Sequence, residues 1–89
     1  MNEEEQITVR HAPERNRFEV ELGNEFGVLT YEIDGPAITF LRTFVPEAHR
    51  NKGVGALLVR EGVDYARRNE LEIDPRCPFV EAWMRRHPE

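Results

Sequence analysis

Residues 50–55 combine two glycines with two basic side chains immediately ahead of an amphipathic pattern of helical period. Glycine lets backbone N–H groups approach a ligand without an intervening Cβ, and the N–H groups at the start of a helix attract anions. Arg50 and Lys52 add positive charge at the rim of such a loop. The segment therefore predicts a phosphate-binding loop, although a pair of glycines also serves ordinary turns.

Two other nucleotide-binding motifs can be compared with this loop. A P-loop requires Gly-Lys followed by Ser or Thr, whereas Lys52 precedes the first glycine here. A dinucleotide-binding fingerprint requires a third glycine at position 58, which is Leu58, although Asp74 lies at a suitable distance for an acid that binds ribose. The sequence therefore disfavours the P-loop and weakens the dinucleotide motif, which stays open as a competitor.

Cys77 is the only cysteine of the chain, which rules out an internal disulfide and a Cys-x-x-Cys zinc site. It follows Arg76 and falls at the expected start of the last helix, and both surroundings favour the thiolate form. Cys77 is therefore a candidate nucleophile. A buried, unreactive cysteine is the competing interpretation, because lone cysteines often pack as small apolar residues.

The three histidines, His11, His49 and His87, lie far apart along the chain and match neither HxxxH nor HExxH spacing. Such spacings place two imidazoles on one helix face, where they bind a metal ion. We therefore predict no metal site.

The elements that must position these residues follow from the alternation of apolar and polar side chains. Three early segments alternate with the period of half-buried strands, and the turns between them contain proline, asparagine or glycine. Short turns of this kind favour antiparallel pairing. The fourth segment is more continuously apolar, so we expect it to be a central strand. The four segments are residues 7–9, 18–22, 29–33 and 37–45.

An amphipathic helix follows the glycine loop and ends near Asn69. Residues 71–74 then form a short fifth strand, and the helical crossover implies that it runs parallel to the fourth. Pro78 suits the first position of a short C-terminal helix. The predicted fold is therefore α+β, with an antiparallel meander of about four strands, a central helix, a parallel fifth strand and a C-terminal helix.

Length and composition predict a single domain, residues 1–89. No apolar run approaches the roughly 18 residues that cross a bilayer, and the first residues lack the pattern of a signal peptide, so we expect a cytoplasmic protein without a membrane partner. Residues 1–35 carry nine acidic and three basic side chains. That charge discourages nucleic acid as a partner and tolerates a basic amine, unless it only solvates the surface.

A longer pattern around the glycine loop resembles the acetyl-CoA-binding motif of the GNAT superfamily, whose pattern is Gln or Arg, two residues, Gly, one residue, then Gly or Ala. Arg50, Gly53 and Gly55 occupy those positions. The C-terminal run is similar to the small YjdJ-like branch of that superfamily. The residues that carry this second likeness are Leu71, Ile73, Pro75, Cys77, Phe79, Val80, Trp83, Met84, His87 and Pro88.

The resemblance implies an abbreviated GNAT fold in which acetyl-CoA is the co-substrate and lies in a splay between the fourth and fifth strands. Its pantetheine arm would run beside Phe44 and Val45. The implied activity is transfer of the acetyl group to the nitrogen of an unidentified amine, by a monomer or a homodimer. The pyrophosphate would contact the backbone of Arg50, Asn51, Lys52, Gly53, Val54, Gly55 and Ala56.

Arg42 departs from the pattern of this branch, whose members commonly carry His at that position. A neutral imidazole can act as a general base, whereas a guanidinium stays protonated. We therefore expect Arg42 either to steady an anionic intermediate or the cofactor, or to have only a structural role.

The resemblance leaves two routes for the reaction. Cys77 would face the acetyl thioester and accept the acetyl group in covalent catalysis. Alternatively, the amine attacks directly while a backbone N–H near Phe44 or Val45 stabilises the oxyanion. Two non-catalytic hypotheses also stay open: a module that binds CoA or acyl-CoA without turnover, and a small protein-interaction domain that keeps the loop only as part of its fold.

Overall fold

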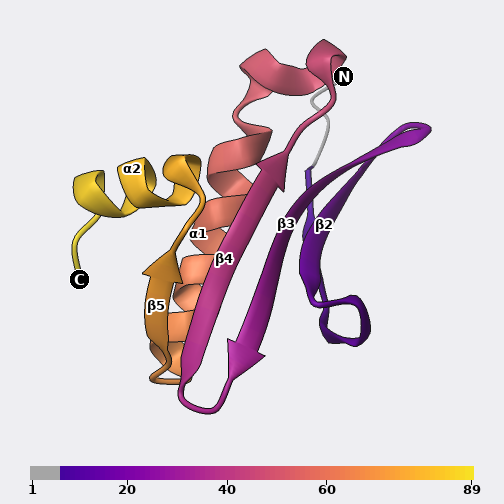
Figure 1. The fold of residues 1–89 in the computed structure, drawn as a ribbon. Helices are drawn as coiled ribbons and strands as arrows, with labels where there is room; N and C mark the ends of the chain where they lie inside the picture. Colours follow the sequence, from indigo (N-terminus) through magenta and orange to yellow (C-terminus); the bar gives the residue numbers. More distant parts are fainter. Residues whose placement is uncertain (1–6) are drawn as a thin grey trace.

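The computed structural model describes residues 7–89. Five strands form one sheet in the order β1-β2-β3-β4-β5, α1 covers one face of the sheet, and α2 lies beyond the end of β5 (Figure 1). This α+β arrangement confirms the predicted meander, central helix, parallel fifth strand and C-terminal helix. The elements are β1 (Val9–Ala12), η1 (Pro13–Arg15), β2 (Arg17–Leu22), β3 (Glu25–Asp34), β4 (Ala37–Phe44), η2 (Glu47–Lys52), α1 (Val54–Arg68), β5 (Glu72–Pro75) and α2 (Pro78–Arg86), where η denotes a 3₁₀ helix.

The first four strands pair antiparallel through short turns. Gly23 and Gly35 occupy the left-handed region in these turns, with φ values of 66° and 59°. Other residues adopt this region at a steric cost, so the glycines allow the tight reversals. The turn residues that the sequence indicates are therefore the ones that connect the meander.

β1 differs from its prediction, because it spans Val9–Ala12 rather than residues 7–9. The physical reason is His11, whose ring stacks on the Phe18 ring with centroids 4.2 Å apart. The imidazole therefore continues the row of side chains on the covered face. The sequence pattern predicts that the strand ends before His11, because histidine is polar.

β4 and β5 are parallel, because α1 carries the chain across the sheet between them. Their pairing runs only from Ala37↔Glu72 to Phe40↔Pro75, although β4 continues to Phe44. β5 begins one residue later than predicted, since the N–H of Leu71 donates to Ala66 O at 2.9 Å and completes the end of α1.

A β-bulge interrupts the pairing of β3 with β4. Tyr31 lies opposite Phe40 and Thr30 lies opposite Arg42, so Leu41 is an extra residue on β4. A bulge increases the local twist of a strand. The last residues of β4 therefore follow a different course from the part that pairs with β5.

The hydrophobic core lies between α1 and the sheet, where Leu58, Val59 and Val63 are fully buried. The helix comes so close to the sheet that a Cβ at Gly62 would lie 2.7 Å from Leu29 Cδ2. Within the described residues, the opposite face of the sheet carries no helix (Figure 1). The molecule therefore has one covered and one uncovered sheet face.

Candidate functional site

The parallel pair of β4 and β5 opens into a splay at the carboxyl ends of the two strands. In the described chain, the final backbone hydrogen bond across this pair runs from the Cys77 N–H to Phe40 O at 3.1 Å. Beyond it the chain enters α2, whereas β4 continues to Phe44. Residues 41–44 therefore border β3 on one side and the splay on the other.

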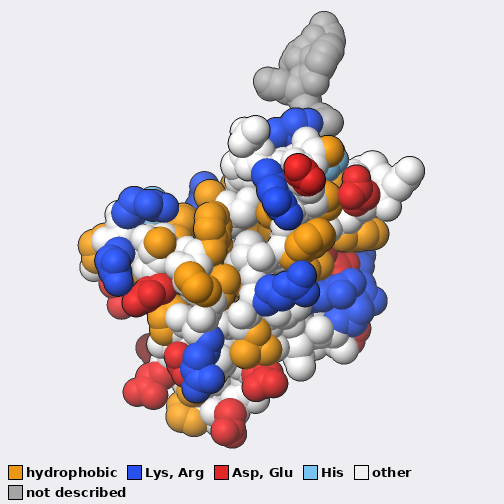
Figure 2. All heavy atoms as spheres, turned by 45° about the horizontal axis from the view of Figure 1, so that its top comes forward, with side chains coloured by type: hydrophobic (Ala, Val, Ile, Leu, Met, Phe, Trp, Pro, Cys, Tyr) orange, Lys and Arg blue, Asp and Glu red, His pale blue; other side chains and the backbone are white. Residues whose placement is uncertain are grey.

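A groove of about 400 Å³ lies at this splay and is called the splay groove below. The end of β4 and the first turns of α1 and α2 form its walls, and most of the lining side chains are apolar or absent, as in glycine. In Figure 2, apolar side chains gather between α2, on the left, and the centre of the molecule. The lining residues are Thr43, Phe44, Val45, Arg50, Gly53, Gly55, Ala56 and Phe79.

Three of the residues predicted to contact a cofactor lie outside this lining. Asn51 and Lys52 are exposed on η2, and Val54 is fully buried in the core. Val54 can therefore offer a ligand only its backbone. The structure brings the other six together around the groove: Phe44, Val45, Arg50, Gly53, Gly55 and Ala56.

The loop predicted between the fourth strand and the central helix contains a 3₁₀ helix, η2, which the sequence does not indicate. Gly53, with φ at 77°, ends η2 and caps α1. The first hydrogen bond of α1 runs from the Leu57 N–H to Gly53 O at 3.2 Å. The N–H groups of residues 54–56 precede that bond and are available to an anion at the positive end of the helix dipole.

Gly55 and Arg50 both contribute to the lining of the splay groove. A Cβ at Gly55 would lie 3.1 Å from the Phe79 ring, so glycine is what allows this ring to pack on the first turn of α1. Arg50 Nε donates to Val45 O at 2.9 Å. A guanidinium has five N–H donors, so the remaining ones can meet a ligand at the rim of the groove.

Cys77 lies directly behind the wall of the groove. Its side chain is buried at the N-cap of α2, and Sγ is 3.4 Å from Oγ1 of Thr43, which lines the groove. Burial raises the pKa of the thiol, but hydrogen bonds from the Thr43 side chain and from the backbone N–H groups of Val80, Phe79 and Thr43 outweigh it, so the pKa lies below its ordinary value. The position therefore favours a thiolate.

Arg76 does not take the part that the sequence suggests beside Cys77. Its Nε pairs with Asp74 Oδ2 at 3.2 Å, and both side chains are well exposed. The groups that lower the thiol pKa are instead the Thr43 hydroxyl and the N–H groups at the start of α2.

Arg42 and Thr43 point to opposite faces of β4. Thr43 pairs with Leu29, a core residue, and contacts Cys77, whereas Arg42 pairs with Thr30 on the uncovered face. The Arg42 guanidinium carbon lies 5.3 Å from the centre of the Phe44 ring, which is the distance of a cation–π contact. Arg42 is thus joined to the groove through Phe44 and not through Cys77.

The family model described as GCN5-related N-acetyl-transferase matches residues 17–89, which include every element from β2 to α2. The chain belongs to this family. The resemblance seen around the glycine loop is therefore confirmed at the level of the acetyltransferase family, and the narrower YjdJ-like branch stays a prediction.

Several curated proteins are similar to this member of the acetyltransferase family along most of its length. Protein NATD1 of Mus musculus is 29% identical in an alignment of 85 positions that covers 92% of this chain and 77% of that protein. Protein NATD1 of Homo sapiens is also 29% identical, over 92% of this chain and 75% of its own. Protein NATD1 of Xenopus tropicalis is 28% identical in an alignment of 91 positions that covers 99% of this chain and 84% of that protein.

Two residues of the splay groove escaped the sequence prediction. Thr43 connects the groove to Cys77, and Phe79 forms the wall that faces Gly55. Strand alternation contains the signal for Thr43, because it must face away from Arg42 and Phe44. Phe79 lies two residues after Cys77 in the first turn of α2. The sequence therefore predicts that it lies near Cys77, but it does not predict its contact with α1.

The histidines are not brought together by the fold. Within residues 7–89, no group of three His, Cys, Asp or Glu side chains has an arrangement that could hold a metal ion. Among the same residues, no helix has both the length and the apolar character that a membrane crossing requires.

Proposed function

We propose that this protein transfers the acetyl group of acetyl-CoA to an amine. The observation that carries the proposal is the splay groove, whose lining includes the start of α1 and Thr43, the residue that contacts the buried Cys77 behind the wall. Membership of the GCN5-related N-acetyltransferase family supports the same activity. The acceptor is an unassigned amine, and we propose that a monomer or homodimer acts in the cytoplasm.

The chemical character of the groove suits acetyl-CoA along its length. The N–H groups of residues 54–56 and the free donors of Arg50 would hold the pyrophosphate. Phe44 and Val45 would flank the pantetheine arm at the unpaired edge of β4, where backbone groups can bond its amides. Glycine at position 53 leaves this approach open, because its lack of a Cβ lets the ligand come close to the backbone.

The hydrogen bonds to Cys77 favour a covalent route. The Cys77 thiolate attacks the acetyl carbonyl, a new S–C bond forms, and CoA departs as a thiolate that takes up a proton from water. A neutral amine then attacks the acetyl-cysteine, releases the Cys77 thiolate and gives its extra proton to water. Thr43 would stabilise the thiolate before and after this exchange.

The direct route needs less of Cys77. A neutral amine attacks the thioester carbonyl, and a backbone N–H near Phe44 or Val45 stabilises the oxyanion. The Cys77 thiol then gives its proton to the departing CoA sulfur, the acetylated nitrogen loses its extra proton to water, and Cys77 takes up a proton from water again. Arg42 stays charged in both routes and accepts no proton, so it would steady negative charge beside Phe44.

Calorimetry and intact mass measurement test these proposals together. We expect CoA and acetyl-CoA to bind to the protein. We also expect the wild-type protein to gain the mass of one acetyl group, and the Cys77→Ala variant to show no such gain. The Cys77→Ser variant should keep the fold intact. An absence of binding at high ligand concentration would sink the proposed function. Binding with an unchanged protein mass and acetylated amine products would support the direct route instead.

A second candidate function is a module that binds CoA without turnover. The observation in its favour is Arg42, because a guanidinium occupies a position where an imidazole could take a proton from the amine. This candidate predicts ligand binding without acetylation of any amine in a panel of polyamines, peptides and amino acids. Acetylated product in the same panel would exclude it.

A further inference from the structure

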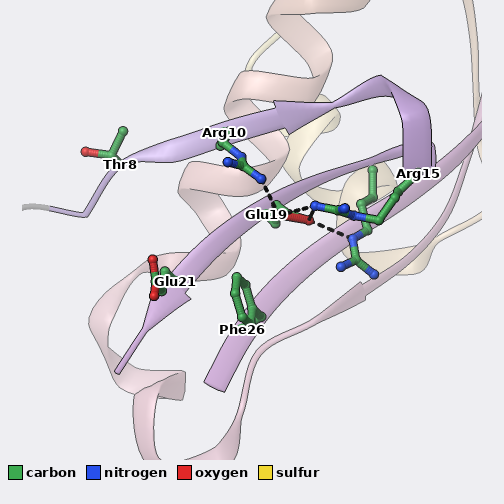
Figure 3. Close-up of a pocket in the computed structure, with 7 residues that line it drawn as sticks. Thr8, Arg10, Arg15, Glu19, Glu21 and Phe26 are labelled. Atoms are coloured by element: carbon green, nitrogen blue, oxygen red, sulfur yellow. Dashed lines mark hydrogen bonds and ion pairs between the residues drawn. The ribbon is translucent and has the colours of Figure 1, made fainter. Parts of the chain in front are cut away.

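A larger hollow of about 600 Å³ lies on the uncovered face of the sheet, over β1, β2 and β3 (Figure 3). It shares no lining residue with the splay groove and is called the arginine hollow below. Three arginines from two strands and η1 contribute to its lining. The lining residues are Thr8, Arg10, Arg15, Arg17, Glu19, Glu21 and Phe26.

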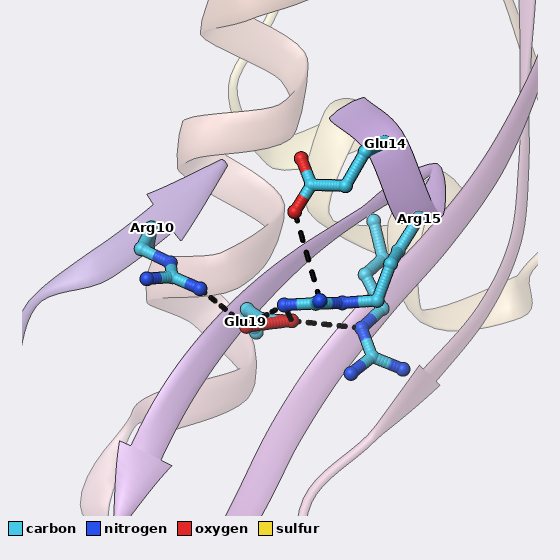
Figure 4. A network of polar contacts seen from close by, with 5 residues as sticks. Arg10, Glu14, Arg15 and Glu19 are labelled. Carbon is cyan, nitrogen blue, oxygen red and sulfur yellow. Dashed lines mark hydrogen bonds and ion pairs between the residues drawn. The ribbon is translucent and has the colours of Figure 1, made fainter. Parts of the chain in front are cut away.

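Glu19 forms the base of the arginine hollow. Its side chain is only 4% exposed, although it lies on the face that no helix covers. Arg17 Nε donates to Glu19 Oε2 at 2.8 Å, Arg15 Nη2 lies 3.1 Å from Oε1, and Arg10 Nη2 lies 3.4 Å from Oε1 (Figure 4). The three guanidinium groups therefore cover the carboxylate and bury it.

One carboxylate does not consume the hydrogen-bonding capacity of three guanidinium groups. Each guanidinium has five N–H donors, and Arg10 directs only Nη2 to Glu19. Arg15 also pairs with Glu14 at 3.6 Å, at the outer edge of the cluster. The side chains of Arg10 and Arg15 are 67% and 45% exposed, so their remaining donors can reach a ligand in the hollow.

Glu19 fixes these donors in advance. Three like charges repel one another, and the buried carboxylate between them offsets that repulsion and restricts their rotamers. Glu19 and Glu14 carry two negative charges against the three guanidinium groups, so the cluster keeps one positive charge in excess. The surplus is positive charge that is already oriented.

The charge changes sign across the arginine hollow. Figure 3 shows Glu21 on the side away from Arg15, with the Phe26 ring beside it. Phe26 is an exposed aromatic residue, and Thr8 adds a hydroxyl at the edge. A compact ligand with one oxyanion would place that group at the arginines, and its apolar part would cover Phe26. Glu21 would disfavour a second negative charge on the ligand.

We propose that the arginine hollow binds a small molecule through a single carboxylate or phosphate group. Arg10, Arg15 and Arg17 donate to the oxyanion, Glu19 holds them in place, and Phe26 contacts the apolar body of the ligand. The site is separate from acetyl transfer, because no step of that reaction uses these residues.

Two aromatic anions and a neutral analogue test this site by titration monitored in ¹H–¹⁵N NMR spectra. We expect benzoate or phenyl phosphate to cause saturable shifts in the Nε–H signals of Arg10, Arg15 and Arg17 and in the amides of Thr8 and Phe26. The anion with the lower dissociation constant identifies the oxyanion that the site prefers. Benzamide, which has no charge, should leave these signals unchanged; saturable shifts with benzamide, or none with either anion, would overturn the proposal.

Arg10→Gln is the sharpest variant, because Arg10 makes the longest contact with Glu19 and leaves Arg15 and Arg17 to cover the carboxylate. We expect about tenfold weaker binding of the preferred anion, as for the loss of one charge-assisted hydrogen bond. Arg60→Gln removes the same charge from the exposed side of α1 and should not change binding. Equal weakening by both variants would mean attraction by net charge alone and would overturn the site.

Phe26→Ala provides a second test that does not alter the charged cluster. Because Phe26 is exposed, this variant should fold normally. It should weaken benzoate or phenyl phosphate several-fold and leave acetate or inorganic phosphate unaffected. Equal losses for the aromatic and the small anions would contradict the proposed position of the apolar group.

Discussion

The splay groove and the arginine hollow lie on different parts of the same sheet and are built from different groups. The groove offers backbone N–H donors, glycines and apolar rings, with Arg50 as the charged residue in its lining. The arginine hollow offers side-chain charges, three guanidinium groups around one carboxylate. The first depends on where the backbone turns, and the second depends on which strands lie side by side.

This difference explains what each region requires of the fold. The hydrogen-bond donors of the groove are mainly backbone N–H groups at the start of α1, so they do not depend on particular side chains. Side-chain substitutions in the groove therefore act mainly by filling space. The arginine hollow depends on the register Arg10↔Glu19 between β1 and β2, which places the two residues opposite each other. Changes in one region should therefore leave the other intact, and variants can test that separation.

Glu19→Gln should have the largest effect on stability. The amide would leave three guanidinium groups without their carboxylate, and because these arginines are partly exposed and can be rehydrated, we expect a loss of about 2 kcal/mol in the free energy of unfolding. Urea denaturation measures the loss. Glu32→Gln, an exposed change on β3, is the matched control and should cost much less.

Binding of CoA shows whether the two regions are separate. The folded Glu19→Gln protein should bind CoA with unchanged affinity, since Glu19 is not part of the groove. A parallel loss of CoA affinity would mean that the two regions depend on each other.

Glu19 also gives the stability a specific dependence on pH. A hydrogen bond from Arg17 lowers the pKa of Glu19 below its usual 4.5, against the opposing effect of burial. The stabilisation is therefore fully present above pH 4.5 and is lost as the pH falls through the lower folded-state pKa. The curves of stability against pH for the wild type and Glu19→Gln should converge in acid, and a constant difference would contradict this role of the carboxylate.

The sequence predicts the backbone-based region better than the side-chain cluster. Gly53 and Gly55 are recognisable because the structure uses their lack of a Cβ directly, at a positive φ and at a close contact with Phe79. The crossover helix implies the parallel β4 and β5. Arg17 and Glu19 instead alternate with Phe18 and Val20, which is the ordinary pattern of a solvated strand face, and Arg15 lies in a polar turn. Their convergence depends on strand register and on the position of η1, which alternation does not specify.

The same limit explains the residues that prediction missed within the groove. Thr43 and Cys77 are 34 residues apart in sequence and meet only because β4 and α2 converge beyond the last β4–β5 hydrogen bond. Phe79 meets Gly55 across two helix starts. Local patterns locate the elements, but these contacts depend on where a bulge and a short 3₁₀ helix direct the chain.

Gly55→Ala should have the next largest effect and should act only on the groove. The added methyl group would lie 3.1 Å from the Phe79 ring and displace that ring into the groove. We expect acetyl-CoA binding to weaken about tenfold, which corresponds to the lower part of the cost of overpacking. Isothermal titration calorimetry measures the change.

Gly35→Ala is the matched control for this variant. It makes the same substitution in the β3–β4 turn at φ 59°, where it should cost about 1 kcal/mol of stability without touching the groove. Equal losses of acetyl-CoA affinity in the two variants would show that affinity follows general stability, and the local explanation would fail.

Thr43→Val sharpens the comparison within the groove. Removing the hydroxyl removes one of the hydrogen bonds that lower the Cys77 pKa, so the thiol should titrate at higher pH. The ¹³Cβ chemical shift of Cys77 against pH reports this titration. Thr43→Ser keeps the hydroxyl and should keep the titration midpoint of Cys77. Arg42→Gln, on the other face of β4, should also leave this midpoint unchanged. An equal shift of the midpoint in all three variants would contradict this role of Thr43.

The smallest expected effect concerns His11, which lies on the covered face next to Arg10 of the uncovered face. Its Nε2 lies 2.6 Å from the Tyr31 hydroxyl, and its ring stacks on Phe18. Burial lowers the pKa of His11 below its usual 6.5, while Glu14 opposes that shift. The unfolded chain therefore binds a proton first, and stability should decline as the pH falls from 6.5 to the folded-state pKa.

Replacing both partners tests this origin without leaving a buried hydroxyl unpaired. His11→Phe with Tyr31→Phe keeps the stacked rings and should remove the decline in stability below pH 6.5. His87→Gln, a change of another histidine near the C-terminus, should preserve the decline. If the double variant kept the same slope of stability against pH, the titrating group would lie elsewhere. If the slope vanished, the two sheet faces would respond to acid in different ways: the uncovered face through Glu19, which loses its charge, and the covered face through His11, which gains one.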